Sequence, residues 1–510
     1  MVAKSYSMGL HGMDAFLVEV ETDLSAGLPA FDIVGLPDMA VKESRDRVRA
    51  AIKNCGFDFP ISRITMNLAP ADKRKEGPVY DLPLFVSILK ASGQLKVDTD
   101  DCVFIGELSL SGELRPVRGI LPMVIKAKDA GFQHMFVPKE NAFEGAVIDG
   151  IEVFPIENIH QLLSHLHKKT ILSPARPVKN SNEQMSCLPD FADVMGQSEA
   201  KRALEISASG GHNILMIGPP GSGKSMLAKR FPSILPDMTF QESIETTKIH
   251  SISGQLAGKT SLIQVRPFRS PHHTVSTAGL SGGGTVPRPG EISLAHNGVL
   301  FLDELPEFSR SAMEVLRQPI EDGIVTISRV NSSVSYPCNI LLVAAMNPCP
   351  CGFFGHPTRY CTCSPKSVTK YLGKISGPLL DRLDLHIEVP PVEYDTLAAR
   401  QKSESSASIR KRVNAAKQIQ NLRFQGTNIH SNANIPSSVL HEICCMSKDA
   451  DSLLKQAFEK LGLSARAYDR VLKVSRTIAD LENSEKIEAH HAAEAVQYRS
   501  LDRKYWLAEV

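Results

Sequence analysis

The sequence has no excess of charge of either sign. Its 57 Lys and Arg residues stand against 56 Asp and Glu residues, which gives a formal net charge of +1. A uniformly basic chain would indicate a surface that binds nucleic acid throughout, and the balance excludes that arrangement. Any nucleic-acid site must therefore be local, in a chain whose 42% hydrophobic and 22% charged residues are ordinary for a soluble globular protein.

Long hydrophobic runs are also missing. No apolar run approaches the roughly 18 residues that would cross a membrane. Residues 1–17 lack the basic segment and apolar core of a signal peptide. The ten cysteines, in a chain without export signals, fit a reducing compartment better than a disulfide scaffold. We expect a cytoplasmic protein with no membrane partner.

No internal repeat divides the 510 residues, a length that predicts two to four domains. Residues 171–190 are polar and contain prolines, so we interpret them as a linker. Residues 191–393 alternate strands and helices, which is typical of a parallel sheet with helices on its faces. Residues 394–510 have the pattern of helices with polar connections. The fold class is therefore α/β with a helical C-terminal part.

Residues 1–170 form a separate mixed segment. Short apolar runs predict strands at 16–20 and 101–105, and helical periodicity predicts helices at 40–54 and 122–130.

The most specific motif is a phosphate loop of the form G-x-x-x-x-G-K-[ST]. It consists of Gly218, Pro219, Pro220, Gly221, Ser222, Gly223, Lys224 and Ser225. The largely apolar run 213–217 predicts a buried strand before it, and a helix is expected after it, which is the context the motif needs. Backbone amides would hold the phosphates of ATP, Lys224 would add a positive charge, and the Ser225 hydroxyl would bind Mg²⁺.

Polar residues follow two further apolar runs. Asp303 and Glu304 end the run 299–302, and Asn347 ends the run 340–346. Ligands of open α/β sheets bind at the carboxyl ends of the strands, so we expect all three near the phosphates. Asp303 would bind Mg²⁺ and Glu304 would polarise the attacking water. Asn347 would orient water or touch the terminal phosphate, although Asn-Pro also favours a simple turn.

Two arginines are candidates for phosphate contacts. Arg382 lies in Leu-Leu-Asp-Arg-Leu-Asp and suits a finger presented to a neighbouring subunit's ATP. The alternative is an internal ion pair between Arg382 and Asp384. Arg466 follows Ser464-Ala465 at the expected start of a helix and is a candidate for a second phosphate sensor.

A basic stretch is the candidate DNA site. Residues 246–290 contain no Asp or Glu, are rich in Gly and Ser, and offer Arg266, Arg269, His272, His273 and Arg288. A flexible basic loop suits contact with a phosphate backbone, and few aromatics are near for base stacking.

A second candidate for DNA contact lies later in the chain. Alternation over 324–336 predicts a β-hairpin with Arg329 near its tip. Contacts between subunits are the alternative for any one of these arginines.

Four cysteines form a C-x-C-x₉-C-x-C pattern between Asn347 and Arg382. They are Cys349, Cys351, Cys361 and Cys363. Four thiolates on one short loop match the ligand count of a structural zinc site, although C-x₂-C pairs are commoner. Ordinary cytosolic thiols are the alternative.

The order of these motifs resembles that of AAA+ ATPases, and within them the helix-2-insert group of MCM helicases and magnesium chelatase. The segment 191–197 resembles the part that contacts adenine in that group, which implies a role for Gln197. Arg266-Pro-Phe-Arg-Ser-Pro-His-His-Thr274 and 288–299 resemble the magnesium-chelatase-like ComM (YifB) family. The resemblance extends over nearly the whole chain.

That resemblance implies a hexameric, ATP-driven DNA motor that promotes branch migration during natural transformation. It implies an AAA+ core with a helix-2 insert and a helical C-terminal lid, with Arg382 and Arg466 supplied by the neighbouring subunit. The expected partners are single-stranded and branched DNA, further copies of the chain, and the recombinase machinery. A chelatase-type ATPase that remodels a metal-inserting protein partner is the alternative.

The N-terminal segment 104–119 resembles the proteolytic domain of Lon, which has a ribosomal S5 domain 2-like α+β fold. This raises a third alternative, ATP-dependent proteolysis by a Ser–Lys dyad. At the position of the Lon serine this chain has Val79, and at the position of the lysine it has Pro122. Neither side chain can act as nucleophile or base, so we expect a Lon-like domain without peptidase activity.

Overall fold

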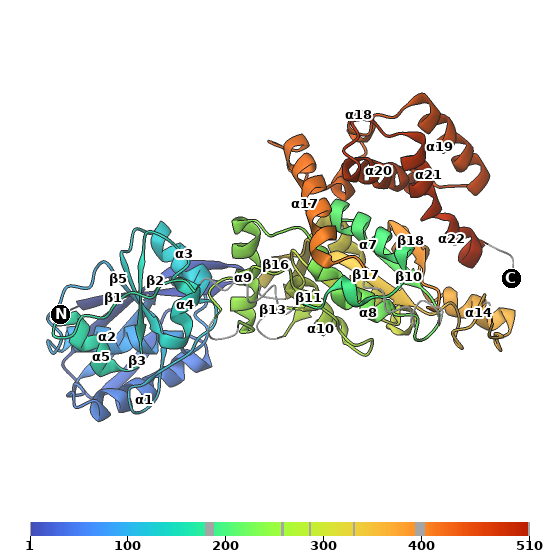
Figure 1. Ribbon diagram of the computed structural model, residues 1–510. Coiled ribbons are helices and arrows are strands. Elements are labelled where there is room, and N and C mark those ends of the chain that lie inside the picture. Colours follow the sequence, from blue (N-terminus) through green and yellow to red (C-terminus); the bar gives the residue numbers. More distant parts are fainter. Residues whose placement is uncertain are drawn as a thin grey trace. The chain divides into compact units, whose positions relative to one another are not determined.

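The computed structural model describes residues 2–178, 188–256, 260–284, 287–329, 332–356, 358–392 and 403–507 (Figure 1). The chain divides into two compact units. The first contains Met1–Asn180 together with Phe240–Ile263 and Ser328–Tyr336. The second contains Ser181–Thr239, Gln264–Ile327 and Pro337–Val510. No helix among the residues described is long and apolar enough to cross a membrane.

The first unit is built on a seven-stranded mixed sheet in the order β3-β4-β2-β1-β5-β8-β9. Its strands are β1 (Val2–His11), β2 (Asp14–Ser25), β3 (Ala30–Val34), β4 (Arg63–Ala69), β5 (Cys102–Phe104), β8 (His134–Pro138) and β9 (Glu152–Ile156). Strand β2 pairs antiparallel with both β1 and β4, whereas β5, β8 and β9 are parallel to one another. The strands predicted at 16–20 and 101–105 are therefore present.

Helices pack on this sheet and bury its apolar residues. They are α1 (Met39–Asn54), α2 (Asp81–Ala91), α3 (Ile120–Asp129), α4 (Ala142–Gly145), α5 (Ile159–Leu166) and, from later in the chain, α9 (Phe240–Ser253). Helix α2 contacts β1 and β2 and is buried over Asp81–Leu89. Helix α1 begins where the Asp38 carboxylate accepts a hydrogen bond from the Val41 amide. Both helices predicted in this part of the chain are confirmed.

The N-terminal part of the first unit also contains three short elements. They are η1 (Pro78–Tyr80), the two-stranded ribbon β6 (Glu107–Leu108) with β7 (Leu114–Arg115), and η2 (Lys139–Asn141). Val79 lies in η1 and Pro122 in α3, and both are buried in or against the core. The specifically Lon-like character of this unit stays a prediction.

The second unit contains a five-stranded parallel sheet in the order β11-β14-β17-β10-β18. The strands are β10 (Ile214–Ile217), β11 (Phe268–Arg269), β14 (Val299–Leu302), β17 (Leu341–Met346) and β18 (Leu385–Glu388). Every residue of β10 and β14 is buried, because helices cover both faces of a parallel sheet. The predicted α/β class with a parallel sheet is confirmed.

The second unit contains further helices and turns before residue 392 among the residues described. They are η3 (Phe191–Asp193), α7 (Ser198–Gly210), α8 (Lys224–Arg230), η4 (Phe231–Ile234), α10 (Thr277–Ser281), α11 (Glu291–Leu294), η5 (Leu305–Glu307), α12 (Arg310–Val315), α13 (Arg317–Asp322), α14 (Pro365–Leu372) and α15 (Gly377–Leu380).

A short antiparallel hairpin separates α10 from α11. Its strands are β12 (Gly282–Gly283) and β13 (Arg288–Pro289). It interrupts the helical connection between β11 and β14, which is where the family pattern places a helix-2 insert. Residues 285–286, between its strands, lie outside the described residues.

A second ribbon consists of β15 (Ile324–Arg329) and β16 (Ser332–Pro337), as the alternation over 324–336 predicts. Its turn, Val330 and Asn331, falls outside the described part of the chain.

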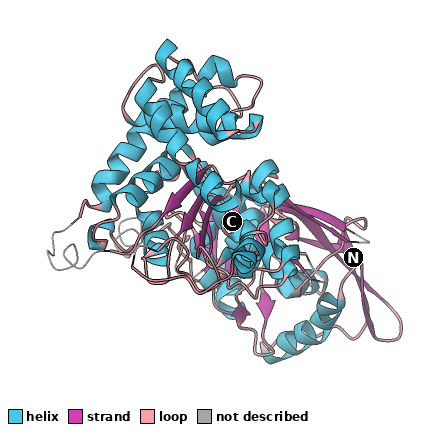
Figure 2. Cartoon of the chain, turned by 90° about the vertical axis from the view of Figure 1, so that its right-hand side faces the viewer, coloured by secondary structure: helices cyan, strands magenta, loops and turns pink. Residues whose placement is uncertain are grey.

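The C-terminal part is helical, as predicted (Figure 2). Its described elements are α17 (Ser406–Arg423), η6 (Asn432–Asn434), α18 (Leu440–Ile443), α19 (Lys448–Leu461), α20 (Ala465–Leu481), α21 (Ala489–Gln497), α22 (Ser500–Asp502) and the π-helix η7 (Arg503–Leu507). Helices α17 and α20 both contact α7, so the sheet and these helices share one apolar core.

Candidate nucleotide site

The phosphate loop lies between the buried strand β10 and helix α8. Gly221 and Gly223 have φ angles of 77° and 96°, which favour glycine because other residues are strained there. Gly218 has a different constraint, since a Cβ at this position would lie 2.3 Å from the Val389 carbonyl oxygen. Helix α8 begins at Lys224, so its first amides face the loop as the motif requires.

Lys224 is held inside the loop. Its ammonium donates to the carbonyl oxygens of Gly218 at 2.7 Å and Pro219 at 2.9 Å, and to Asn347 Oδ1 at 3.3 Å. Burial lowers the pKa of Lys224 to about 8, against the negative charges of Asp303 and Glu304, which raise it. Lys224 is therefore a desolvated cation. It lies where a bound phosphate would compete with these carbonyl oxygens for the hydrogen bonds of the ammonium.

The two predicted Mg²⁺ ligands come together. Ser225 Oγ donates to Asp303 Oδ2 at 2.6 Å, although the residues come from α8 and from the end of β14. One hydroxyl and one carboxylate oxygen at this separation suit a single Mg²⁺, which prefers few protein oxygens together with phosphate and water. The residues present thus fit the ion that the motif implies.

Glu304 lies beside this pair in an unusual backbone conformation. Its φ is 53°, in the left-handed region, and its amide donates to Asp303 Oδ1 at 3.0 Å. The carboxylate is 3.4 Å from Nδ1 of His273, a residue of the acid-free stretch. Left-handed non-glycine residues are uncommon and gather at functional sites.

Strand register explains why Asn347 reaches the loop. Strand β17 lies between β10 and β14, with Met346 opposite Ile217 and Ala344 opposite Leu302. Since the three strands are parallel, their carboxyl ends meet at one edge of the sheet. Asn347 therefore joins Lys224 directly, as the sequence predicts.

Gln197 connects the phosphate loop to the segment that follows β18. Its φ is 58°, and its Nε2 donates to the Pro390 carbonyl oxygen at 2.6 Å and to that of Ser222 at 3.3 Å. The residue predicted from the family pattern to lie near adenine is thus next to the phosphate loop.

Arg382 is not presented to the surface. Its side chain is 9% exposed, it forms an ion pair with Glu321, and it donates to the Pro378 carbonyl oxygen at 2.5 Å. The alternative of an internal pair with Asp384 is wrong, because Asp384 pairs with Arg470 at 2.9 Å. Burial alone would raise the pKa of Asp384, but His212 and Arg470 hold it at about 2.

Arg466 lies at the start of α20 and is exposed. Ser464, two residues earlier, caps the helix by accepting from the Ala467 amide. The predicted helix start is therefore present, and the guanidinium is on the surface of the second unit.

The DNA candidates divide into two groups. Arg266 donates to three backbone carbonyl oxygens, including that of Asn297 at 2.8 Å, and Arg269 forms a bidentate pair with Glu291 at 2.7 Å. Their internal partners correct the expectation that these two arginines are available to DNA. Arg288 and His272 are exposed, while the Arg329 side chain lies outside the described residues.

The four cysteines converge. Their sulfur atoms all lie within 4.8 Å of one another, as the spacing C-x-C-x₉-C-x-C predicts. Gly352, inside the loop, lies so close to the phosphate loop that a Cβ would be 2.4 Å from Pro220 Cδ.

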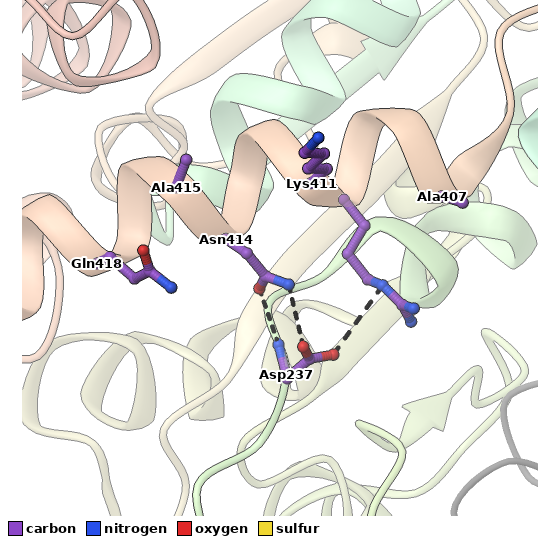
Figure 3. Close-up of a pocket in the computed structure, with 7 residues that line it drawn as sticks. Asp237, Ala407, Lys411, Asn414, Ala415 and Gln418 are labelled. Atoms are coloured by element: carbon purple, nitrogen blue, oxygen red, sulfur yellow. Dashed lines mark hydrogen bonds and ion pairs between the residues drawn. The ribbon is translucent and has the colours of Figure 1, made fainter.

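One surface pocket of about 420 Å³ lies on helix α17 of the same unit (Figure 3). It is lined by Asp237, Ala407, Arg410, Lys411, Asn414, Ala415 and Gln418. Asp237 and Asn414 hydrogen-bond to each other at 3.0 and 3.2 Å. No phosphate-loop residue lines the pocket, so we assign it no part in nucleotide binding.

Several partners in the site were not predicted from the sequence. Glu321 pairs with Arg382, and Arg470 pairs with Asp384. His273 contacts Glu304. The two residues of each pair are far apart in the sequence. The sequence shows only that a charged residue has no residue of opposite charge near it in the chain. It does not identify the distant residue that pairs with it in the fold.

Three family models match the chain. A model described as magnesium chelatase, subunit ChlI, matches residues 190–397, and one described as subunit ChlI of Mg-chelatase matches residues 20–141. The model of the ChlI C-terminal part matches residues 403–499. Together they span the N-terminal segment, the phosphate-loop core and the C-terminal helices.

Individual relatives extend over nearly the full length. The chain is 44% identical to competence protein ComM of Haemophilus influenzae, over 98% of this chain and 97% of that protein. It is 43% identical to the uncharacterized protein YifB of Escherichia coli, over 96% of each. The match to the magnesium-chelatase 67 kDa subunit of Chlorobaculum tepidum is 31% identical but covers 31% of this chain and 23% of that subunit.

Proposed function

The chain belongs to the magnesium-chelatase-like ComM (YifB) family, and on that premise we propose that it is an ATP-driven motor that moves on DNA. The work it performs is branch migration during natural transformation and homologous recombination. The name of the Haemophilus relative, a competence protein, supports this process. Its cofactors are ATP and Mg²⁺ at the phosphate loop.

The chemistry follows from the residues around the phosphate loop. Loop amides and Lys224 bind the phosphates, while Ser225 and Asp303 hold Mg²⁺, which neutralises charge on the transferred phosphoryl group. Glu304 orients and polarises the attacking water, and Asn347 positions Lys224 and the terminal phosphate. When ATP binds, the Lys224 ammonium exchanges its hydrogen bonds to the Gly218 and Pro219 carbonyl oxygens for hydrogen bonds to phosphate.

One contact carries the link between ATP and DNA. His273 belongs to the acid-free stretch 246–290 and its Nδ1 lies 3.4 Å from the Glu304 carboxylate. Exposed His272 and the hairpin residue Arg288 lie in the same stretch. DNA that binds these residues would move His273 and so free Glu304 for hydrolysis. Backbone contacts of this kind weaken steeply as salt rises.

We propose a homo-hexamer in which each ATP lies between two subunits. Arg382 and Arg466 then act on the neighbour's phosphates. Arg382 must exchange its ion pair with Glu321 for the nucleotide, so that pair is the resting state of the finger.

Hydrolysis measured with and without DNA tests this function. We expect single-stranded and forked DNA to stimulate ATP hydrolysis at low salt, and branched DNA to be unwound. Arg288→Ala should reduce the stimulation, whereas Arg63→Ala, at another exposed arginine, should not. Absence of both stimulation and unwinding at about 50 mM salt would contradict the motor, since backbone binding is strongest there.

A chelatase-type ATPase that remodels a protein partner is the second candidate. The family models carry the chelatase name, but the Chlorobaculum subunit matches only 31% of the chain. If this function is correct, a protein partner stimulates ATP hydrolysis, and DNA does not change its rate. Proteolysis is disfavoured, because Val79 and Pro122 offer no nucleophile or base.

A further inference from the structure

The loop that follows β17 brings four thiols to one point. The sulfur of Cys349 lies 3.3 Å from that of Cys351 and 3.7 Å from that of Cys361, and Cys351 lies 3.5 Å from Cys361. Cys363 completes the group. Each separation is far longer than a disulfide bond of about 2.05 Å. Four sulfurs around a tetrahedral zinc with Zn–S bonds of about 2.3 Å would be about 3.8 Å apart.

The backbone around the cluster is shaped for sulfur ligands. Gly352 and Gly355 have φ angles of 84° and 73°, which lets the loop turn back on itself after Cys351. The Phe354 amide donates to Cys349 Sγ at 3.3 Å. Amide donors to the ligating sulfurs are the usual outer contacts of a thiolate site.

The cluster adjoins the nucleotide site on two sides. Asn347, which accepts from Lys224, precedes Cys349 by two residues. On the other side Gly352 packs on Pro220, where a Cβ would be 2.4 Å from the proline Cδ. Both faces of this contact belong to the second unit.

We propose that Cys349, Cys351, Cys361 and Cys363 bind one Zn²⁺, and that the metal holds this loop against the phosphate loop. Sulfur-only tetrahedral sites select zinc or iron–sulfur centres, and zinc needs no redox partner. Four ligands close the coordination sphere, so the ion is structural and does no chemistry on ATP. Metal binding fixes Gly352 and Asn347 and thereby the positions of Pro220 and Lys224.

Metal content tests the site directly. Native mass spectrometry and elemental analysis of the wild-type chain should find one zinc per chain, released as a mercurial reagent titrates four thiols. Cys361→Ser should lose the zinc, and Cys445→Ser, at an exposed cysteine outside the loop, should keep it. Less than about 0.1 zinc per wild-type chain, iron in its place, or a disulfide between these cysteines would overturn the proposal.

The coupling to ATP is tested by binding and rests on the proposed nucleotide site. A fluorescent ATP analogue should bind about tenfold more weakly to Cys361→Ser than to Cys445→Ser, because a small displacement of the loop misplaces the phosphate contacts. Unchanged affinity after zinc loss would overturn the coupling and leave the metal site intact. Zinc with no ATP binding in the wild type would instead contradict the nucleotide site.

Discussion

Glu304 illustrates how much a single residue's position matters in this protein. Its backbone is left-handed, and its carboxylate lies 3.4 Å from Nδ1 of His273. Asp303, one residue earlier, faces Ser225. Two adjacent acids thus have separate partners, which suits one to hold Mg²⁺ and the other to polarise water.

Removing the charge of Glu304 tests the second role. Glu304→Gln should bind ATP but hydrolyse it at least about 100-fold more slowly, since the amide cannot act as a base. Glu307→Gln is the control, because Glu307 is a nearby carboxylate that pairs with Lys374 at 3.2 Å. Single-turnover hydrolysis and ATP binding measure both. Normal turnover in Glu304→Gln would show that another group activates the water.

His273 should restrain Glu304 when no DNA is bound. Removing its ring in His273→Ala is expected to raise basal ATP hydrolysis by no more than about fivefold, since a partly exposed side-chain contact of this kind contributes about 0.2–1 kcal/mol. Stimulation by DNA should fall at the same time. His430→Ala, at an exposed histidine of the C-terminal part, should change neither rate. An unchanged basal rate of ATP hydrolysis in His273→Ala would contradict this restraint.

At the scale of elements, short helix α4 holds a buried acid. Glu144 is 5% exposed and accepts from Asn141 Nδ2 at 3.0 Å. Burial raises its pKa to about 7. The folded state therefore holds a proton that the unfolded chain releases near pH 4.5, and this contribution to stability is present below pH 4.5 and is lost as the pH rises to about 7.

Glu144→Gln should abolish this pH dependence. At pH 8 the variant should gain up to about 3 kcal/mol in unfolding free energy, and near pH 4 it should equal the wild type. Glu140→Gln, at an exposed neighbour, should have no effect. Thermal melting between pH 4 and 8 measures both variants. A wild-type curve that is flat over this range would contradict the assignment.

The positions of the strands were easier to predict from the sequence than the partners of the charged side chains. Apolar runs located β10, β14 and β17 within a residue, because a buried parallel strand must be apolar throughout. The charged side chains between them were less predictable. Arg266 and Arg269 carry the charge expected of DNA contacts, but the fold supplies them with backbone carbonyls and Glu291. Net charge along a stretch does not reveal which charges are already neutralised inside the fold.

At the scale of the whole molecule, the proposed hexamer makes Arg382 a residue of its neighbour's site. Mixing Lys224→Ala chains with Arg382→Ala chains, each inactive alone, should then restore activity. In random one-to-one rings about a quarter of the interfaces combine an intact Lys224 with an intact Arg382, so about a quarter of the wild-type rate is expected.

The control for that mixture carries both substitutions on one chain. Mixed with Lys224→Ala chains, it offers no intact Lys224 and should stay inactive. Steady-state ATP hydrolysis after subunit exchange gives the result. No recovery in the first mixture would mean that Arg382 acts within its own chain, in agreement with its pair to Glu321.

Local order along the chain sufficed for the phosphate loop, the acids at strand ends, the cysteine spacing and the family. These features depend on residues a few positions apart, whose geometry one strand or turn sets. The packing of distant segments decided the rest: Glu321 beside Arg382, His273 beside Glu304, and Gly352 against Pro220. Each of these pairs joins elements far apart in sequence, and their approach follows from sheet order and helix packing, which no local pattern contains.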